Sequence, residues 1–106
     1  MTRVINSASD INRIVRTEQM LGYVVTAVTL NPRGVPRTGL SFCCDLDTPD
    51  RTEGIRHAMR RIEDGDYFEK NPSDLRTLVV DAILQGYRHV PHPLRHHVKR
   101  AAIKAL

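Results

Sequence analysis

Histidines gather near the C-terminal end of this chain. Four of the five lie between residues 89 and 97, namely His89, His92, His96 and His97. His92 and His96 stand four residues apart, a spacing by which one helical face can offer two imidazoles to zinc. His92 lies between two prolines, however, and no cysteine or carboxylate flanks the group. A solvated polar face that gains positive charge at low pH is the favoured interpretation, and we expect no metal and no cofactor.

Candidate nucleophiles also lack the surroundings that catalysis needs. A nucleophilic Ser or Cys is held by a histidine and an orienting acid, and the residues around Ser41 and Cys43 match no known nucleophile turn. Cys43 and Cys44 are adjacent, where an intrachain disulfide is strained, so we expect both to be reduced and to pack as small apolar side chains. The segment from Gly34 to Gly39 does not have the form of a phosphate-binding loop. The sequence therefore predicts that the protein is not an enzyme.

The composition is that of one folded domain. The chain has 106 residues, of which 41% are hydrophobic and 26% charged, so residues 1–106 are expected to form a single domain. Aromatic residues make up 5%, which leaves a core of aliphatic side chains that self-association would enlarge, and a homodimer is expected. No apolar run is long enough for a membrane span or a secretion signal. We therefore expect a cytoplasmic protein without a membrane partner.

The first half of the chain contains a predicted helix and a predicted hairpin. Ser7 and Asp10 stand at capping-box spacing and precede a helical apolar pattern, which predicts a helix over residues 8–21. Residues 23–30 are rich in β-branched types and suit a strand, although their spacing also continues the helix. We favour the strand because Gly22 interrupts the pattern. After a loop at 31–39, a strand at 40–46 would complete a β-hairpin.

Three helices are predicted in the second half. Thr48-Pro49-Asp50 starts one over residues 49–64, and Gly65 stands where it should end. Asn71-Pro72-Ser73-Asp74 starts another, which runs to Gln85 before Gly86. The third of these helices begins at Pro93 and continues to about residue 105. The sequence thus predicts a mainly helical α+β fold with an N-terminal helix, a β-hairpin and three C-terminal helices.

The helix ending at Gln85 is apolar on two sides. One stripe comprises Leu75, Leu78, Val79, Ala82 and Ile83. Val80 and Leu84 point well away from it, and Tyr87 follows just beyond. Such a helix is either central to a core or committed to a partner. With the aromatic pair Tyr67 and Phe68 in the preceding loop, these residues predict a protein-binding anchor, and the alternative is that they complete the core or a dimer interface.

Positive charge is concentrated at the C-terminal end. Five of the sixteen Lys and Arg residues lie in positions 86–106, where there is no Asp or Glu, and the formal +4 divides into −1 before this segment and +5 within it. The last predicted helix carries a basic surface of Arg95, Lys99, Arg100 and Lys104. These residues suggest an alternative function, binding of nucleic acid through phosphate contacts. No Asn or Gln in that helix is available to identify bases, so we favour a protein partner.

Two segments resemble a known family in size and layout. They are RTEGIRHAMRRIED at residues 51–64 and PSDLRTLVVDAILQ at residues 72–85, about a quarter of the chain. The chain resembles the small bacterial antiactivators of the QslA type, which act on a LuxR-type quorum-sensing receptor. The resemblance implies that the protein binds a transcriptional regulator, blocks its dimerisation and keeps it off DNA. No binding residue is carried over from that family.

Overall fold

The computed structural model describes residues 13–44 and 51–96. In sequence order these contain strands β1 (Arg13–Met20), β2 (Tyr23–Leu30) and β3 (Arg37–Cys44), followed by helices α2 (Arg51–Glu63) and α3 (Leu75–Leu84). Residues 92–96 are also helical. The chain divides into two compact units, Met1–Asn71 and Pro72–Leu106, so the sheet and α2 belong to the first and α3 to the second.

Strand β1 replaces the N-terminal helix that the sequence predicted. Residues 13–20 pair along their whole length with β2, and the tight turn between them consists of Leu21 and Gly22. Both turn residues have positive φ, 49° and 85°, as a type I′ hairpin turn requires. In the sequence, Gly22 is compatible with the end of a helix over residues 8–21, because glycine suits a helix end as well as a hairpin turn. The backbone hydrogen bonds between residues 13–20 and β2 favour the hairpin turn over the helix end.

The three strands form one antiparallel sheet in the order β1-β2-β3. Strand β2 is central, which suits its run of β-branched and apolar residues, and it is buried from Val25 to Thr29. Strand β3 begins at Arg37, earlier than the predicted residue 40, and ends within the described chain at Cys44. A short segment after α2 touches the outer edge of β3, where Thr38 and Phe68 form an isolated antiparallel bridge.

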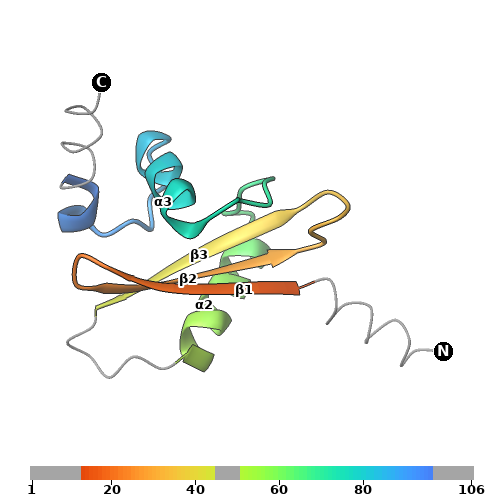
Figure 1. The fold of residues 1–106 in the computed structure, drawn as a ribbon, viewed down its shortest axis with the longest axis horizontal. Coiled ribbons are helices and arrows are strands. Elements are labelled where there is room, and N and C mark those ends of the chain that lie inside the picture. Colours follow the sequence, from red (N-terminus) through yellow and green to blue (C-terminus); the bar gives the residue numbers. More distant parts are fainter. Residues whose placement is uncertain (1–12, 45–50, 97–106) are drawn as a thin grey trace. The chain divides into compact units, whose positions relative to one another are not determined.

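Helix α2 packs across one face of this sheet, against β2 and β3 (Figure 1). Val28 from the sheet and Ala58 and Ile62 from the helix form the buried centre of this contact. Partly buried hydrophobic side chains surround it, namely Val15, Leu30, Ile55, Met59 and Tyr67. Small residues let the helix come close: a Cβ at Gly54 would lie 2.6 Å from the Thr26 hydroxyl. This packing places α2 directly beside β3.

The second unit contains α3 and its caps. Asp74 is the N-cap: its carboxylate accepts hydrogen bonds from the Thr77 amide, at 2.8 Å, and from the Thr77 hydroxyl, at 3.0 Å. The predicted stripe of Leu75, Leu78, Val79, Ala82 and Ile83 is buried. After the helix, the Gly86 and Tyr87 amides donate to the carbonyls of Ile83 and Ala82. The sequence signals for both ends of this helix are therefore confirmed to within a few residues.

The predicted fold class is wrong. The described residues contain three strands of eight residues each, so the fold is a small α+β structure with a three-stranded sheet and is not mainly helical. The error has one main source, the assignment of residues 8–21 to a helix, of which 13–20 are a strand. The predicted caps at Ser7 and Thr48 and the last helix beyond His96 lie outside the described residues. Within the described ranges, no helix has the length and apolar character needed to cross a membrane.

Candidate protein-interaction surfaces

The end of α3 carries an exposed apolar side chain. Leu84 is 59% exposed, while Val80 and Tyr87 are partly buried. We call these three residues the α3 surface. Val80 and Leu84 are one helical turn apart and so share a side of the helix. The ring of Tyr87 meets that of His89 edge-on, with centroids 5.3 Å apart.

The two aromatic residues that were predicted to join this surface lie in the first unit instead. Tyr67 packs beside the α2 core, with the guanidinium of Arg37 5.4 Å from its ring centroid. Phe68 is 9% exposed, and its amide and carbonyl both bond to Thr38 at 2.9 Å. The Thr38 hydroxyl donates to the Lys70 carbonyl at 2.6 Å and therefore accepts from Thr29. Phe68 thus pairs with the edge of the sheet, and its ring is buried.

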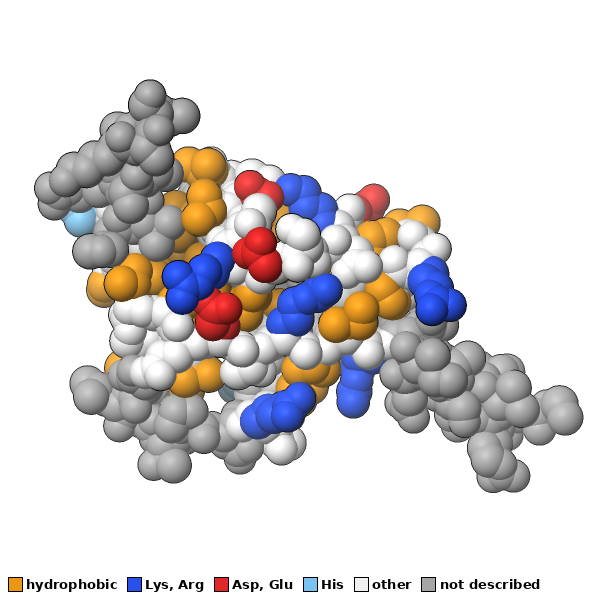
Figure 2. Space-filling view, in the orientation of Figure 1, with side chains coloured by type: hydrophobic (Ala, Val, Ile, Leu, Met, Phe, Trp, Pro, Cys, Tyr) orange, Lys and Arg blue, Asp and Glu red, His pale blue; other side chains and the backbone are white. Residues whose placement is uncertain are grey.

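The predicted basic surface is described only at Arg95. Its Nη2 donates to the Tyr87 carbonyl at 2.8 Å, and its Nε is buried. Arg95 therefore stabilises the turn after α3 instead of extending toward a phosphate. Lys99, Arg100 and Lys104 lie outside the described residues. On the face shown in Figure 2, the described basic side chains are spread among acidic and apolar ones.

A groove that the sequence analysis missed lies between β3 and α2. It has a volume of about 380 Å³. Its lining comes from Ser41, Phe42 and Cys43 on the strand and from Glu53, Gly54, His57 and Arg61 on the helix. Three of the helical residues, at positions 53, 57 and 61, recur every four residues and so follow one side of α2. We call this the β3–α2 groove.

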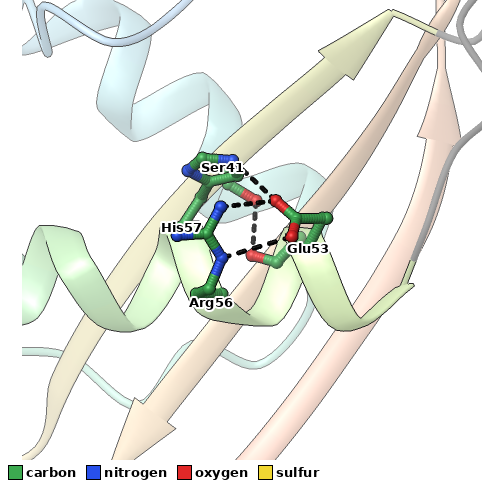
Figure 3. Close-up of polar contacts among 5 residues, drawn as sticks. Ser41, Glu53, Arg56 and His57 are labelled. Atoms are coloured by element: carbon green, nitrogen blue, oxygen red, sulfur yellow. Dashed lines mark hydrogen bonds and ion pairs between the residues drawn. The ribbon is translucent and has the colours of Figure 1, made fainter.

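Glu53 is the centre of a charged cluster on the helical wall of the groove. Arg56 donates to both of its carboxylate oxygens, at 3.3 and 2.6 Å, and the His57 Nε2 lies 3.4 Å from Oε2 (Figure 3). The hydrogen bond from Arg56 is the main reason that the pKa of Glu53 lies below its ordinary value. The same bond raises the pKa of Arg56. The negative charge of Glu53 is therefore already matched by its neighbours.

Arg61 differs from Arg56 and Arg60 on the same helix. Arg56 pairs with Glu53, and the Arg60 Nε lies 3.9 Å from Asp64. Arg61 has no ion pair with any described residue, and its buried Nε has no acceptor there. A buried N–H without an acceptor is costly, since its desolvation is not compensated. Among the described residues, Arg61 is thus a cation beside the groove without a counter-charge.

The groove does not assemble a nucleophile and base. Ser41 is buried, and its hydroxyl donates to the Gly54 carbonyl at 2.8 Å, while His57 faces Glu53 (Figure 3). Cys43 and Cys44 are free thiols. Across residues 13–44 and 51–96, no group of three or more His, Cys, Asp or Glu side chains is arranged to hold a metal ion. The groove supplies polar contacts beside a strand edge whose outer backbone groups bond, among the described residues, to Phe68 alone.

The four-residue spacing of Glu53, His57 and Arg61 was the signal that sequence reasoning had for the groove. From the sequence alone, the charges of residues 49–64 indicate a solvated helix face, since nothing local shows which face of the helix meets a strand edge. The comparisons with known proteins add no assignment: the sequence matches no family model, and no curated protein or solved structure resembles it significantly.

Proposed function

We propose that this chain is a small regulatory protein of the cytoplasm that binds another protein and inhibits it by occupying its interaction surface. A bacterial transcriptional regulator is the partner class, as the resemblance of residues 51–64 and 72–85 to small antiactivators implies. The observation that carries the proposal is the 59% exposure of Leu84, one turn after Val80 and three residues before Tyr87, on a helix whose main apolar stripe is already buried.

The physical argument concerns what the α3 surface gains from a partner. Full burial of a leucine side chain contributes roughly 1.5–3 kcal/mol. An exposed leucine with a partly buried valine one helical turn away, and a partly buried tyrosine nearby in sequence, provides the apolar and aromatic side chains found at the centre of protein interfaces. Leu21 and Val35 are also exposed. Each lies in a turn between two strands, so neither belongs to an apolar helix surface as Leu84 does.

Binding of nucleic acid, the alternative from the sequence, receives no support from the described part of the basic surface. Arg95 is engaged with the Tyr87 carbonyl. The contacts of the described residues therefore favour a protein partner.

The proposal is tested with Leu84→Arg. We expect this variant to bind its partner about 2 kcal/mol more weakly, roughly thirtyfold in Kd, because a charge replaces the apolar anchor. The partner is captured from lysate of the native cell, washed at high salt with nuclease, and identified by mass spectrometry. Binding of the purified partner is then measured by calorimetry for the wild type and the variant.

Val35→Arg is the matched control. Val35 is 62% exposed, and its substitution also replaces an exposed apolar side chain with arginine, but in the first unit. It should bind as the wild type does. Circular dichroism should show unchanged helix content for both variants. Equal binding by Leu84→Arg and the wild type would overturn the proposal. Light scattering on the same samples distinguishes partner binding from the alternative that the α3 surface is a dimer interface. If Leu84→Arg halves the mass of the protein and leaves partner binding intact, the α3 surface serves self-association.

A further inference from the structure

We propose that the outer edge of β3 binds an extended segment of a partner protein as a fourth strand, with an acidic side chain of that segment meeting Arg61 in the β3–α2 groove. This inference concerns the unit Met1–Asn71 and is independent of the α3 surface. Strand addition to an open sheet edge is a common means of recognising peptides, because main-chain hydrogen bonds supply affinity and side-chain pockets supply selectivity.

The backbone of β3 is oriented for this role. The amide and carbonyl of Thr38 both bond to Phe68, so they point away from β2. Direction alternates along a strand, and the register between β2 and β3 is regular from Arg37 to Cys44. The main-chain groups of Leu40 and Phe42 therefore also point outward. No other described segment forms a backbone hydrogen bond with them.

The chain itself shows that this edge accepts a strand. Phe68 pairs with Thr38 in antiparallel fashion, which is the first step of a fourth strand. The segment then leaves the edge, because the Asp66 amide bonds to the Arg61 carbonyl at the end of α2, at 2.8 Å. The position opposite Leu40, where a continued strand would place residue 66, is left open by that turn. An added strand would continue the row that Phe68 begins.

The groove determines which chain fits. Alternate side chains of an added strand project toward α2, into the space of about 380 Å³ lined by Glu53, His57 and Arg61. Glu53 already has Arg56 as its counter-charge, whereas Arg61 has none among the described residues. A carboxylate in the added strand would supply that counter-charge and an acceptor for guanidinium N–H groups. The chemistry of the groove thus selects an extended segment with an acidic residue.

A second copy of this chain fits the same edge less well. If β3 of another molecule were the added strand, its residues on the helix-facing side would be Gly39, Ser41 and Cys43. None of these described residues is acidic, so none of them would supply a carboxylate to Arg61. The charge of the groove therefore favours a different protein as the occupant.

The first arm of the test uses two blocked synthetic peptides of alternating Val and Thr, one with a central Glu and one with Lys at that position. Each is titrated into the ¹⁵N-labelled full-length protein. We expect the Glu peptide to shift the amide signals of residues 40–44 and the Arg61 side-chain signal, with the Lys peptide binding at least tenfold more weakly. A Glu peptide methylated on alternate backbone amides should not bind. Absence of binding by the unmethylated Glu peptide at millimolar concentration would overturn the proposal.

The second arm changes the protein edge. Phe42→Pro removes an outward amide without taking a hydrogen bond from the pairing with β2, so the sheet should persist and peptide affinity should fall at least tenfold. Phe42→Val removes the same ring but keeps the amide, so it should bind the peptide at least tenfold more tightly than Phe42→Pro does. Equal peptide binding by Phe42→Pro and Phe42→Val would contradict strand addition.

The charge preference has its own pair of variants. Arg61→Gln should abolish the difference between the Glu and Lys peptides, while Arg60→Gln, which removes a charge paired with Asp64, should leave that difference intact. A preference that survives Arg61→Gln would contradict the role of Arg61. If light scattering shows a wild-type dimer that Phe42→Pro converts to a monomer, the edge is occupied by a second copy and the proposal is wrong. None of these variants touches the α3 surface, so their failure leaves the proposed function intact.

Discussion

Asp74 links the start of α3 to solution pH. Its carboxylate accepts hydrogen bonds from the Thr77 amide and hydroxyl, and the backbone bond is the main reason that its pKa lies below the ordinary value. A carboxylate whose pKa is lower in the folded state stabilises that state above its unfolded pKa. The stabilisation is lost as pH falls through the folded pKa.

We therefore predict that Asp74→Ala lowers the melting temperature at neutral pH and that the gap from the wild type narrows as pH falls below about 4. Thermal unfolding followed by circular dichroism across a pH series measures this gap. Asp74→Asn is the control, since it keeps a capping oxygen but does not titrate, and its deficit at neutral pH should be smaller. A gap of constant size down to acid pH would show that the carboxylate charge does not contribute.

Residue types alone indicated some of these roles and obscured others. The capping residues before α3 are a local signal, because the acceptor and the amide it satisfies are three residues apart. No local pattern indicates the position of Phe68, because its backbone bonds to Thr38, thirty positions earlier in the chain. An aromatic residue in a short loop suggests an exposed anchor until its distant partner is known.

At the scale of elements, the close packing of α2 on β3 is decided by Gly39. A Cβ at this position would collide with the Ala58 carbonyl oxygen and lie 3.1 Å from the Ile62 side chain. A helix backbone cannot yield to such a contact without moving away from the sheet. The sequence analysis placed Gly39 in a surface loop, because glycine and proline are frequent between residues 31 and 39.

We predict that Gly39→Ala destabilises the protein by about 1–3 kcal/mol, the usual cost of overpacking, although alanine favours a strand more than glycine does. Urea unfolding gives the free energy. Gly34→Ala is the matched control, since a Cβ there meets only the Asn31 Cβ, at 3.9 Å, and should change stability little. Equal loss in both variants would mean that contact with α2 is not the cause.

At the scale of the whole molecule, the formal charge of +4 does not by itself define the partner. Of the basic residues predicted to face nucleic acid, Arg95 is bonded to the Tyr87 carbonyl. The two proposed surfaces, the α3 surface and the edge of β3, would bind mainly through apolar and backbone contacts, with a single charge pair at Arg61. Such contacts are weakly screened by salt, in contrast to phosphate contacts.

Raising the salt concentration from about 50 to 200 mM should therefore change the Kd for the captured partner by less than about threefold. Binding through six or more phosphates would weaken by about a thousandfold over the same range. Fluorescence anisotropy with the labelled partner, and separately with a mixed-sequence DNA duplex, measures both cases. A steep loss of partner binding with salt, or tight DNA binding at 200 mM, would contradict a protein-binding role.

The sequence by itself determined the features that depend on neighbours within a few residues. The C-terminal end of α2, both ends of α3, the buried stripe of α3 and the outward position of Leu84 follow from local start and stop signals and from helical spacing. Only the tertiary structure decided the rest. Gly22 became a hairpin turn because residues 13–20 pair with β2, and the β3–α2 groove exists because a strand edge and a helix meet. Local patterns leave such choices open, since a backbone amide can be satisfied within a helix or across a sheet, and the distant partner decides which.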